Sequence, residues 1–568
     1  MPTRTTRAAF AGALVLTTLA TAGVTTARAA PTQAVSEEFV VLSADETSVA
    51  AAQAVVEAAG GTVKSVNTDV GLLTVETSNA GFAAAVSADA AVAGVAHNRP
   101  IGFAPSTGRK ARWEDVEKAT EDRGRAQQGG DDPADDGEGE PLAGRQWDMR
   151  MIHATEDGSY AVNPGNAGVT VGIIDTGVDG SHPDIAPNFN SDLSRNFTTD
   201  IEDVDGPCAD EPDGSCEDPA DVDENGHGTH VAGTIGSPLN GLGIGGVAPN
   251  VTLVNLRAGQ DSGFFFLGPT VDAYTYAGNN GIDVVNMSYF TDPWLYNCAA
   301  NPADSPEQQA EQRTIIEASQ RALRFARRHG VTLVSAIGNG HTDLGNPTID
   351  VISPDYPIGT EYPREIDNSC LTVPTELDGV VSISALGPSG NKADYSDYGI
   401  EQTDFSAPGG FFRDFFGTDR FMTARNMILA PYPLNVAMVE GLVDPVSGQP
   451  GPGGFVIADC TGATIDTCTY WQYIQGTSMA SPHAAGVAAL VVSAHGTEDA
   501  VHGGLTMAPG EVERVMRKTA TDTPCPAENP VDYLDEGRDD TYTAFCEGLP
   551  WKNGFYGHGI VNALGAVK

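Results

Sequence analysis

Basic residues are scarce in this chain of 568 residues, which carries 31 Lys and Arg against 76 Asp and Glu and has a formal net charge of −45. A surface of that sign repels nucleic-acid phosphates and anionic lipid headgroups. We therefore expect no nucleic-acid partner and no membrane partner. The eight cysteines contain no Cys-x-x-Cys pair, so the sequence gives little support to a zinc or dithiol redox site.

Long apolar runs are also lacking, apart from one at the N-terminus. Arg4 and Arg7 precede an apolar stretch over 8–24, and the small-residue sequence ARAA ends at Ala30. A basic start, a short hydrophobic core and an Ala-x-Ala end are typical of a secretory signal peptide, and the stretch is short for a membrane anchor. Residues 1–30 are predicted to be a signal peptide, and the protein is predicted to be secreted and extracellular.

In an exported protein the even number of cysteines indicates disulfide bonds, because disulfides persist in an oxidising environment. Eight cysteines allow 105 pairings. Short loops favour three pairs and leave a fourth: Cys208–Cys216, Cys460–Cys468, Cys525–Cys546 and Cys298–Cys370.

Residues 31–101 have the pattern of a small α+β unit. Apolar strands are expected at 39–42, 63–66, 72–75 and 92–95, with Ala-rich helices at 48–59 and 80–86. The order β-α-β-β-α-β is that of a ferredoxin-like unit. The next segment, 102–145, loses the apolar signal and contains the acidic run DDPADDGEGEP, so it is predicted to be a disordered linker.

Residues 146–568 alternate buried strands with helices. Strands are expected at 169–174, 251–256, 283–287, 331–336 and 380–385, and helices at 228–235, 270–279 and 306–329. Strands that are apolar on both faces and separated by helices predict an α/β fold, a doubly wound and mainly parallel sheet in three layers. Such sheets carry their chemistry at the carboxyl ends of the strands.

The most informative stretch is GTSMASPHAAG at 476–486. Its glycine-flanked turn places Ser478 at the start of a small-residue helix, where free backbone N–H groups can face an anion. An acyl-transfer nucleophile needs such an accessible hydroxyl beside donors for the developing oxyanion. Taken alone, the motif is also compatible with an ordinary helix cap.

Two other residues complete a candidate constellation. Asp175 ends the first strand of the large domain, and His227 lies among glycines at the expected start of a helix. His230 lies one turn further on, but the spacing differs from His-Glu-x-x-His and no third ligand is apparent, which disfavours zinc. The chain order is Asp, then His, then Ser.

These motifs resemble those of the subtilisin-like serine peptidases, the subtilases. The resemblance covers about 150–568 and rests on DTG at 175–177, HGTHVAG at 227–233 and GTSMASPH at 476–483. It implies that Ser478 is the nucleophile, that His227 is the general base and that Asp175 orients the imidazole. Asn339, in SAIGNG, matches the family's oxyanion-hole asparagine. The resemblance thus implies a serine endopeptidase that acts through an acyl-enzyme.

Further roles follow from the same resemblance. An extended protein or peptide substrate would pair with two edge segments and meet one pocket wall, formed by Gly259, Gln260, Ser288, Tyr289, Ile337 and Gly338. The bulky sequence YFT at 289–291 departs from the small residues usual in the family, which favours a narrow-specificity processing peptidase as an alternative. A catalytically silent relative used as a binding protein is a second alternative, although all three triad residues are present.

No cofactor is required for the chemistry, but structural calcium is a candidate. The residues that match the family's calcium loop are Asp184, Asn240, Leu242 and Ile244. The acidic loop at 200–224 also suits calcium and is equally typical of a solvated loop.

The resemblance also implies an inhibitor-type propeptide at 31–101, a monomer, and a catalytic domain over 146–568 that runs to the end of the chain. An insert at about 409–473 precedes the nucleophile motif. The sequence leaves open whether this insert is an interaction surface or decoration.

Overall fold

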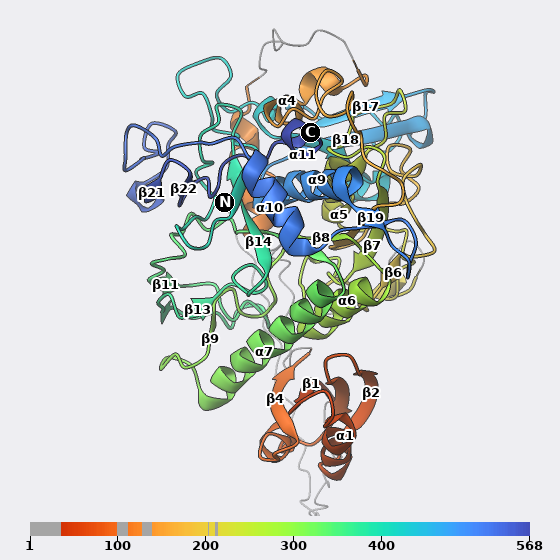
Figure 1. The fold of residues 1–568 in the computed structure, drawn as a ribbon, viewed down its shortest axis with the longest axis vertical. Helices are drawn as coiled ribbons and strands as arrows, with labels where there is room; N and C mark the ends of the chain where they lie inside the picture. The colour runs from red at the N-terminus through yellow and green to blue at the C-terminus, as the bar shows by residue number, and fades with distance from the viewer. Residues whose placement is uncertain (1–35, 99–111, 128–138, 203, 211–213) are drawn as a thin grey trace, which may run out of the picture. The chain divides into compact units, whose positions relative to one another are not determined.

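The computed structural model describes residues 36–98, 112–127, 139–202, 204–210 and 214–568 (Figure 1). The predicted signal peptide and most of the predicted acidic run lie outside these residues.

Seven parallel strands form the central sheet, in the order β15-β14-β10-β8-β5-β7-β6. Their bounds are β5 Thr170–Ile174, β6 Arg195–Asn196, β7 Thr252–Arg257, β8 Val284–Met287, β10 Thr332–Ala336, β14 Val380–Leu386 and β15 Phe405–Pro408. Every residue of β8, β10, β14 and β15 is buried, as expected for strands covered on both faces. The predicted strands are thus confirmed to within about two residues.

Helices cover both faces of this sheet. One apolar cluster joins it to α5 (His227–Gly236) and α9 (Thr477–His495), together with α10 (Pro509–Thr519) and α11 (Ala563–Ala566). The other cluster joins it to α6 (Leu267–Asn279) and α7 (Pro306–Arg328). A capping box, in which Ser305 and Gln308 bond each other's backbone N–H groups, begins α7. The predicted three-layer α/β fold is confirmed.

The N-terminal unit is a four-stranded antiparallel sheet with two helices. Its elements are β1 Glu37–Ser43, α1 Val49–Ala58, β2 Thr62–Asn67, β3 Leu72–Thr77, α2 Phe82–Val86 and β4 Val92–His97. The sheet order is β2-β3-β1-β4, and both helices pack into one small apolar cluster with it. This is the predicted β-α-β-β-α-β order. The sheet also bonds to α7, where Arg321 donates to the carbonyls of Ser43 and Val70.

The segment between the two units differs from the disordered linker predicted over 102–145. It contains α3 (Arg112–Glu117) and the 3₁₀ turns η1 (Arg123–Arg125) and η2 (Ala143–Arg145), and is followed by α4 (Trp147–Met151). Val116 packs against the main apolar cluster, and Ala119 is buried in a separate cluster with Phe412 and Met422. These contacts bury apolar side chains of a segment that has few of them, so the segment is ordered by packing against distant parts of the chain.

The insert before α9 contains a small antiparallel sheet and packs on the main apolar cluster. Its antiparallel sheet has the order β16-β18-β17, from Ile428–Pro431, Cys468–Ile474 and Val456–Cys460, and α8 (Leu434–Val439) follows β16. Strand β18 leads directly into Gly476 and the nucleophile motif. The insert therefore borders the start of α9.

All four predicted disulfides are present: Cys208–Cys216, Cys298–Cys370, Cys460–Cys468 and Cys525–Cys546. The remaining strands are two-residue pieces: β9 Asn297–Cys298, β11 Ile349–Asp350, β12 Arg364–Glu365, β13 Cys370–Leu371, β19 Thr497–Glu498, β20 Leu505–Thr506, β21 Gly548–Leu549 and β22 Lys552–Asn553. The Cys298–Cys370 bridge joins β9 to β13, which also pair by hydrogen bonds.

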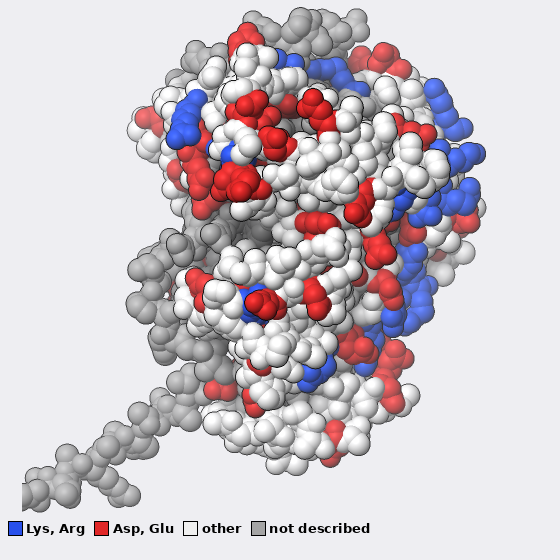
Figure 2. All heavy atoms as spheres, turned by 90° about the vertical axis from the view of Figure 1, so that its left-hand side faces the viewer, with Lys and Arg blue, Asp and Glu red and all other residues white. Residues whose placement is uncertain are grey.

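Surface charge follows the acidic composition. On the face drawn in Figure 2, carboxylates gather over the upper part, while Lys and Arg lie mainly along one edge. None of the helices in the described part of the chain combines the length and the hydrophobicity that crossing a lipid bilayer needs.

Candidate active site

The candidate catalytic residues lie at the ends of strands and the starts of helices. Asp175 directly follows β5, and Asn339 follows β10 after Gly338. His227 is the first residue of α5, and Ser478 is the second residue of α9. Parallel strands bring their carboxyl ends to one edge, so residues from four distant segments reach the same place.

Asp175 and His227 form a buried hydrogen-bonded pair although 52 positions separate them in the sequence. Asp175 Oδ1 lies 2.7 Å from His227 Nδ1 and also accepts the backbone N–H of Thr176 at 2.8 Å. Gly226 adopts φ of +93°, which turns the chain into α5 and positions the imidazole. Burial raises the pKa of Asp175, and its imidazole partner opposes that shift.

Asn339 is oriented by the residue before the candidate nucleophile. Its Oδ1 accepts the backbone N–H and the hydroxyl of Thr477, both at 2.9 Å. The Thr477 hydroxyl also accepts the N–H of Gly338 at 3.1 Å, which connects the turn after β10 to the start of α9.

One residue in this centre was not predicted from the sequence. Glu117, at the end of α3, is 5% exposed. Ser478 Oγ donates to its Oε1 at 2.6 Å, and Asn339 Nδ2 donates to the same oxygen at 3.2 Å. Glu117 Oε2 lies 3.6 Å from His227 Nε2. Among the described residues no hydrogen bond joins His227 to Ser478, because the Glu117 carboxylate contacts both.

The pKa of the His227 imidazole depends on the carboxylates of both Asp175 and Glu117. Burial lowers the pKa of His227, but Asp175 and Glu117 outweigh it and hold that pKa well above its ordinary value of 6.5. His230, by contrast, is buried with its Nε2 against the carbonyls of Ile428 and Gln472, and burial lowers its pKa to about 3. His230 therefore packs against the insert, as a neutral structural residue.

The predicted substrate-contact residues lie around this centre with different exposures. Gly259 pairs with Phe265, and the Gln260 side chain is buried and donates to the carbonyl of Thr199. Ser288 Oγ donates to the carbonyl of Ser478 at 3.0 Å. Ile337 is fully buried in an apolar cluster, and the adjacent Gly338 is half-buried. The side chains of Gln260 and Ile337 thus serve packing, and any substrate contact there would come from the backbone.

Tyr289 links the two predicted edge segments. Its ring stacks on Phe265 with centroids 4.2 Å apart and planes 5° apart. Its hydroxyl bonds that of Tyr274 at 2.7 Å. The bulky side chain is thus held beside the Gly259–Phe265 bridge.

The residues around Asp184 have one feature of a cation site, a buried carboxylate. Asp184 is fully buried, its Oδ2 accepts the N–H groups of Ile244 and the Trp471 ring, and its Oδ1 has no hydrogen-bond partner among the residues that the structure describes. Burial raises the pKa of Asp184 to about 7. Asn240 Oδ1 accepts the N–H of Leu242 at 2.8 Å on the adjoining loop. A buried carboxylate oxygen is a donor of the kind that calcium prefers.

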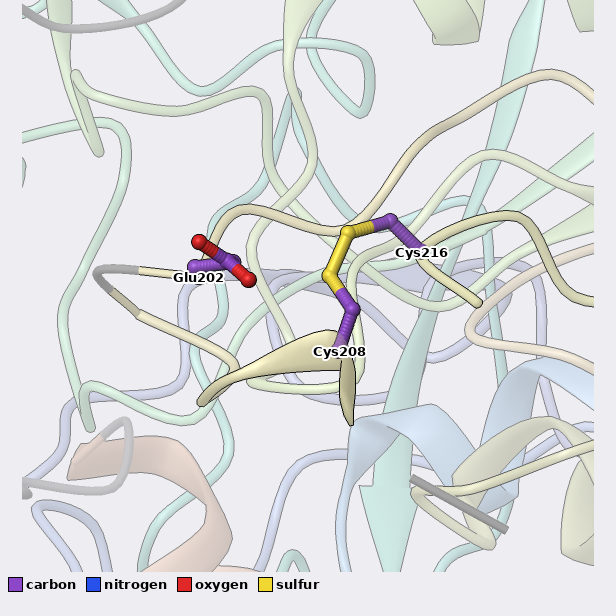
Figure 3. A group of neighbouring side chains, drawn as sticks. All are labelled: Glu202, Cys208 and Cys216. Carbon is purple, nitrogen blue, oxygen red and sulfur yellow. A yellow bond between two sulfur atoms is a disulfide. The ribbon is translucent and has the colours of Figure 1, made fainter. Parts of the chain in front are cut away.

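Two other acidic clusters in the described residues do not need an ion. Asp200, Asp218 and Asp261 surround the fully buried guanidinium of Arg257, which already neutralises part of their charge. Glu202 lies beside Cys208 and Cys216, but Figure 3 shows that these two sulfur atoms are bonded to each other and are not free thiolates.

Comparison with known proteins identifies the family to which this fold belongs. Subtilisin DY of Bacillus licheniformis is 28% identical over 331 residues, which are 58% of this chain and 79% of that protein. The nisin leader peptide-processing serine protease NisP of Lactococcus lactis is 26% identical over 360 residues, 62% of this chain and 44% of that protein. The thermophilic serine proteinase of Bacillus sp. AK1 is 25% identical over 338 residues, 59% of this chain and 55% of that protein. The chain thus spans about half the length of the last two relatives.

Solved structures agree on the fold. The epidermin leader peptide processing serine protease EpiP of Staphylococcus aureus superposes with a TM-score of 0.58 at 20% identity, covering 94% of this chain and 98% of that one. Fervidolysin of Fervidobacterium pennivorans gives 0.53 at 19% identity, covering 95% and 62%. Residues 166–542 match the model of the subtilase family. The chain belongs to the subtilase family and is a serine-type peptidase.

Proposed function

We propose that this protein is a secreted endopeptidase that hydrolyses peptide bonds in proteins through an acyl-enzyme on Ser478. The observation that carries the proposal is the 2.7 Å bond between Asp175 and His227, at the sheet edge where Ser478 begins α9. The amide of Asn339, whose Nδ2 bonds the same Glu117 oxygen as Ser478 Oγ, would supply the electrophilic part of the same centre.

Each residue has one role in this mechanism. Ser478 Oγ attacks the scissile carbonyl while His227 Nε2 takes its proton and then delivers it to the leaving amine. Asp175 keeps the proton of the neutral imidazole on Nδ1 and stabilises the imidazolium. Asn339 Nδ2 and the N–H of Ser478 donate to the oxyanion. Water then attacks the acyl-enzyme with His227 again as the base.

The substrate would be an extended protein or peptide segment. The backbone around Gly259 and Gln260 would pair with it on one side, and that of Ser288 and Tyr289 on the other. Such pairing makes few demands on substrate sequence. Ile337 and Gly338 would border the pocket for the residue before the scissile bond.

Secretion and regulation are parts of the same proposal. The basic-apolar start at 1–30 and the four disulfides support export, and the protein would work outside the cell as a monomer. The ferredoxin-like unit within 31–101 would act as an inhibitory propeptide on the catalytic domain at 146–568. Its hydrogen bonds to α7 support that role.

The test is covalent labelling of the matured, secreted protein with a fluorophosphonate, together with casein cleavage. We expect one labelled serine and cleavage at several sites. A mature protein that takes no label and leaves casein intact would refute the proposed function.

A narrow-specificity processing peptidase is the second candidate. Two relatives are named for leader-peptide processing, and the stacked Tyr289 and Phe265 side chains stand at one edge segment. A peptide-library profile separates the candidates. Cleavage confined to one short sequence motif favours the second candidate, and broad cleavage favours the first.

The rate should depend on the charge of His227. The neutral imidazole is the base, so kcat/KM is full above the His227 pKa and is lost as the pH falls through it. Burial lowers this pKa and Asp175 raises it, so we expect a rising limb within the range from pH 5 to 9. The measurement is kcat/KM of the mature enzyme between pH 5 and 9, and a flat profile would contradict the role of His227.

Structural calcium would be held by the Asp184 and Asn240 side chains and the carbonyls of Leu242 and Ile244. It would supply the positive charge that the unpaired Asp184 oxygen lacks. We expect a chelator to lower the Tm of the protein by about 3 °C, the effect of removing a ligand present at about 100 times its Kd. Asp184→Asn should abolish the chelator's effect, and the exposed Asp192→Asn should keep it. An unchanged Tm with the chelator argues against the site.

A further inference from the structure

Glu117 is held in the catalytic centre by its backbone as well as by its carboxylate. The Gln475 N–H donates to the carbonyl of Glu117, and the Gln475 side chain donates to the carbonyl of Val116, both at 3.0 Å. A Cβ on Gly476 would lie 3.0 Å from the Glu117 side chain, so the glycine before the nucleophile motif leaves room for it. Residues 116–117 thus dock directly on the strand end that leads to Ser478.

The residues that follow Glu117 are bound by the insert. Asp122 pairs with Arg413 at 2.7 Å, and Lys118 pairs with Glu440 at 2.5 Å. All four side chains are at least 85% buried, so water screens these pairs poorly.

Two further contacts join the segment after Glu117 to the insert. The Arg123 guanidinium lies 4.7 Å from the ring centroid of Phe455, and Gln127 N–H donates to the carbonyl of Met422 at 3.0 Å. The insert surface that binds this segment is formed by Arg413, Met422, Glu440 and Phe455. Its Arg413 and Glu440 carry charges opposite to those of Asp122 and Lys118, and its Phe455 ring contacts Arg123.

We propose that this insert surface is a docking site for residues 115–127 of the chain, and that the docked segment blocks the enzyme by placing the Glu117 carboxylate against Ser478, Asn339 and His227. The partner that fits the surface is a peptide with a carboxylate for Ser478 and Asn339 and a second carboxylate, five residues later, for Arg413. The segment lies outside the ferredoxin-like unit and forms a second inhibitory element.

The Glu117 carboxylate would inhibit the catalytic residues in two ways. Glu117 Oε1 accepts from Asn339 Nδ2, one of the two donors that would stabilise the oxyanion, and it also accepts from the hydroxyl of the nucleophile, Ser478 Oγ. The other carboxylate oxygen, Oε2, lies 3.6 Å from His227 Nε2, so the imidazole pairs with an anion instead of accepting the serine proton. Departure of the segment would free both at once. This inference rests on the proposed function, because it assumes that Ser478 is the nucleophile.

The first test measures fluorophosphonate labelling of the unprocessed full chain, read only in the gel band of full mass. We expect Glu117→Ala to label at least about tenfold faster than the wild type, because a buried charge-assisted contact is lost. Glu117→Gln keeps the shape and loses the charge, so it should be intermediate. Asp122→Asn, which weakens the anchor to Arg413, should also label faster. Glu121→Gln is the matched control on an exposed residue and should label at the wild-type rate.

The second test reads the contact without any reaction. In full chain carrying Ser478→Ala, which cannot process itself, the pKa of His227 is followed by NMR of labelled histidine. Adding Glu117→Gln should lower that pKa by roughly one to three units, because an opposite charge beside the imidazole disappears. Adding Glu121→Gln should leave it unchanged.

The outcomes separate this inference from the proposed function. If Glu117→Ala labels no faster than the wild type, or if the His227 pKa does not move, the docking proposal is wrong while the peptidase stands. If no form labels, including the matured protein, the proposed function itself fails. Equal thermal melting of the variants excludes misfolding as the cause of faster labelling.

Discussion

Replacing Ser478 by alanine is expected to lower turnover by about 10⁶-fold, the loss known for the nucleophile of subtilisin, a relative of this chain. The acyl-enzyme cannot form without the hydroxyl. The oxyanion donors, Asn339 Nδ2 and the backbone N–H at position 478, remain in place. Residual activity near the level that binding and the oxyanion hole alone provide is therefore expected.

The measurement is hydrolysis of a peptide substrate by the matured enzyme, with fluorophosphonate labelling in parallel. Ser493→Ala is the matched control, because Ser493 lies in the same helix and bonds only the carbonyl of Ala489. It should keep both activity and label. If Ser478→Ala still labels, or loses less than tenfold, another residue is the nucleophile.

Replacing Asp175 by asparagine is expected to lower kcat by about 10⁴-fold with little change in KM. The amide is uncharged and can present its NH₂ group to Nδ1, which moves the imidazole proton to Nε2. His227 then offers a proton to Ser478 where it should accept one. The imidazolium that forms during catalysis also loses its counter-charge, so the pKa of His227 should fall.

Kinetics between pH 5 and 9 test this prediction, since a purely structural role for Asp175 would not move the rising limb. The exposed Asp192→Asn serves as the control for loss of one negative charge and should behave as the wild type. A variant at Asp175 that keeps wild-type kcat would show that His227 does not depend on this carboxylate.

The central sheet and the catalytic motifs were predictable because their signals are local. The strands that form β5, β8 and β10 are short, continuous apolar runs, and such runs are buried on both faces wherever they occur in an α/β fold. Glycines around His227 and Ser478 mark sharp turns into helices, which few other residues permit. The motif order then indicated which side chains would meet at the sheet edge.

Glu117 and the structured linker could not be predicted in the same way. An acidic residue in a charged segment has no local preference for a buried site, and its cost of burial is met by partners far away in the sequence, such as Asn339 and Ser478. The same holds for Asp122, whose partner Arg413 lies 291 positions further on. Only packing of the insert beside α9 brings these groups together.

The sequence by itself determined the family, the α/β fold, the cysteine pairs and the identity of the candidate triad. The fold and the motifs depend on residue type and spacing within short stretches, and three of the cysteine pairs close short loops and leave Cys298–Cys370 as the fourth. The tertiary structure alone decided that a linker carboxylate separates His227 from Ser478 and that the insert holds the linker there. Such contacts depend on surfaces that exist only after the chain has folded, since their free energy comes from groups brought together across hundreds of residues.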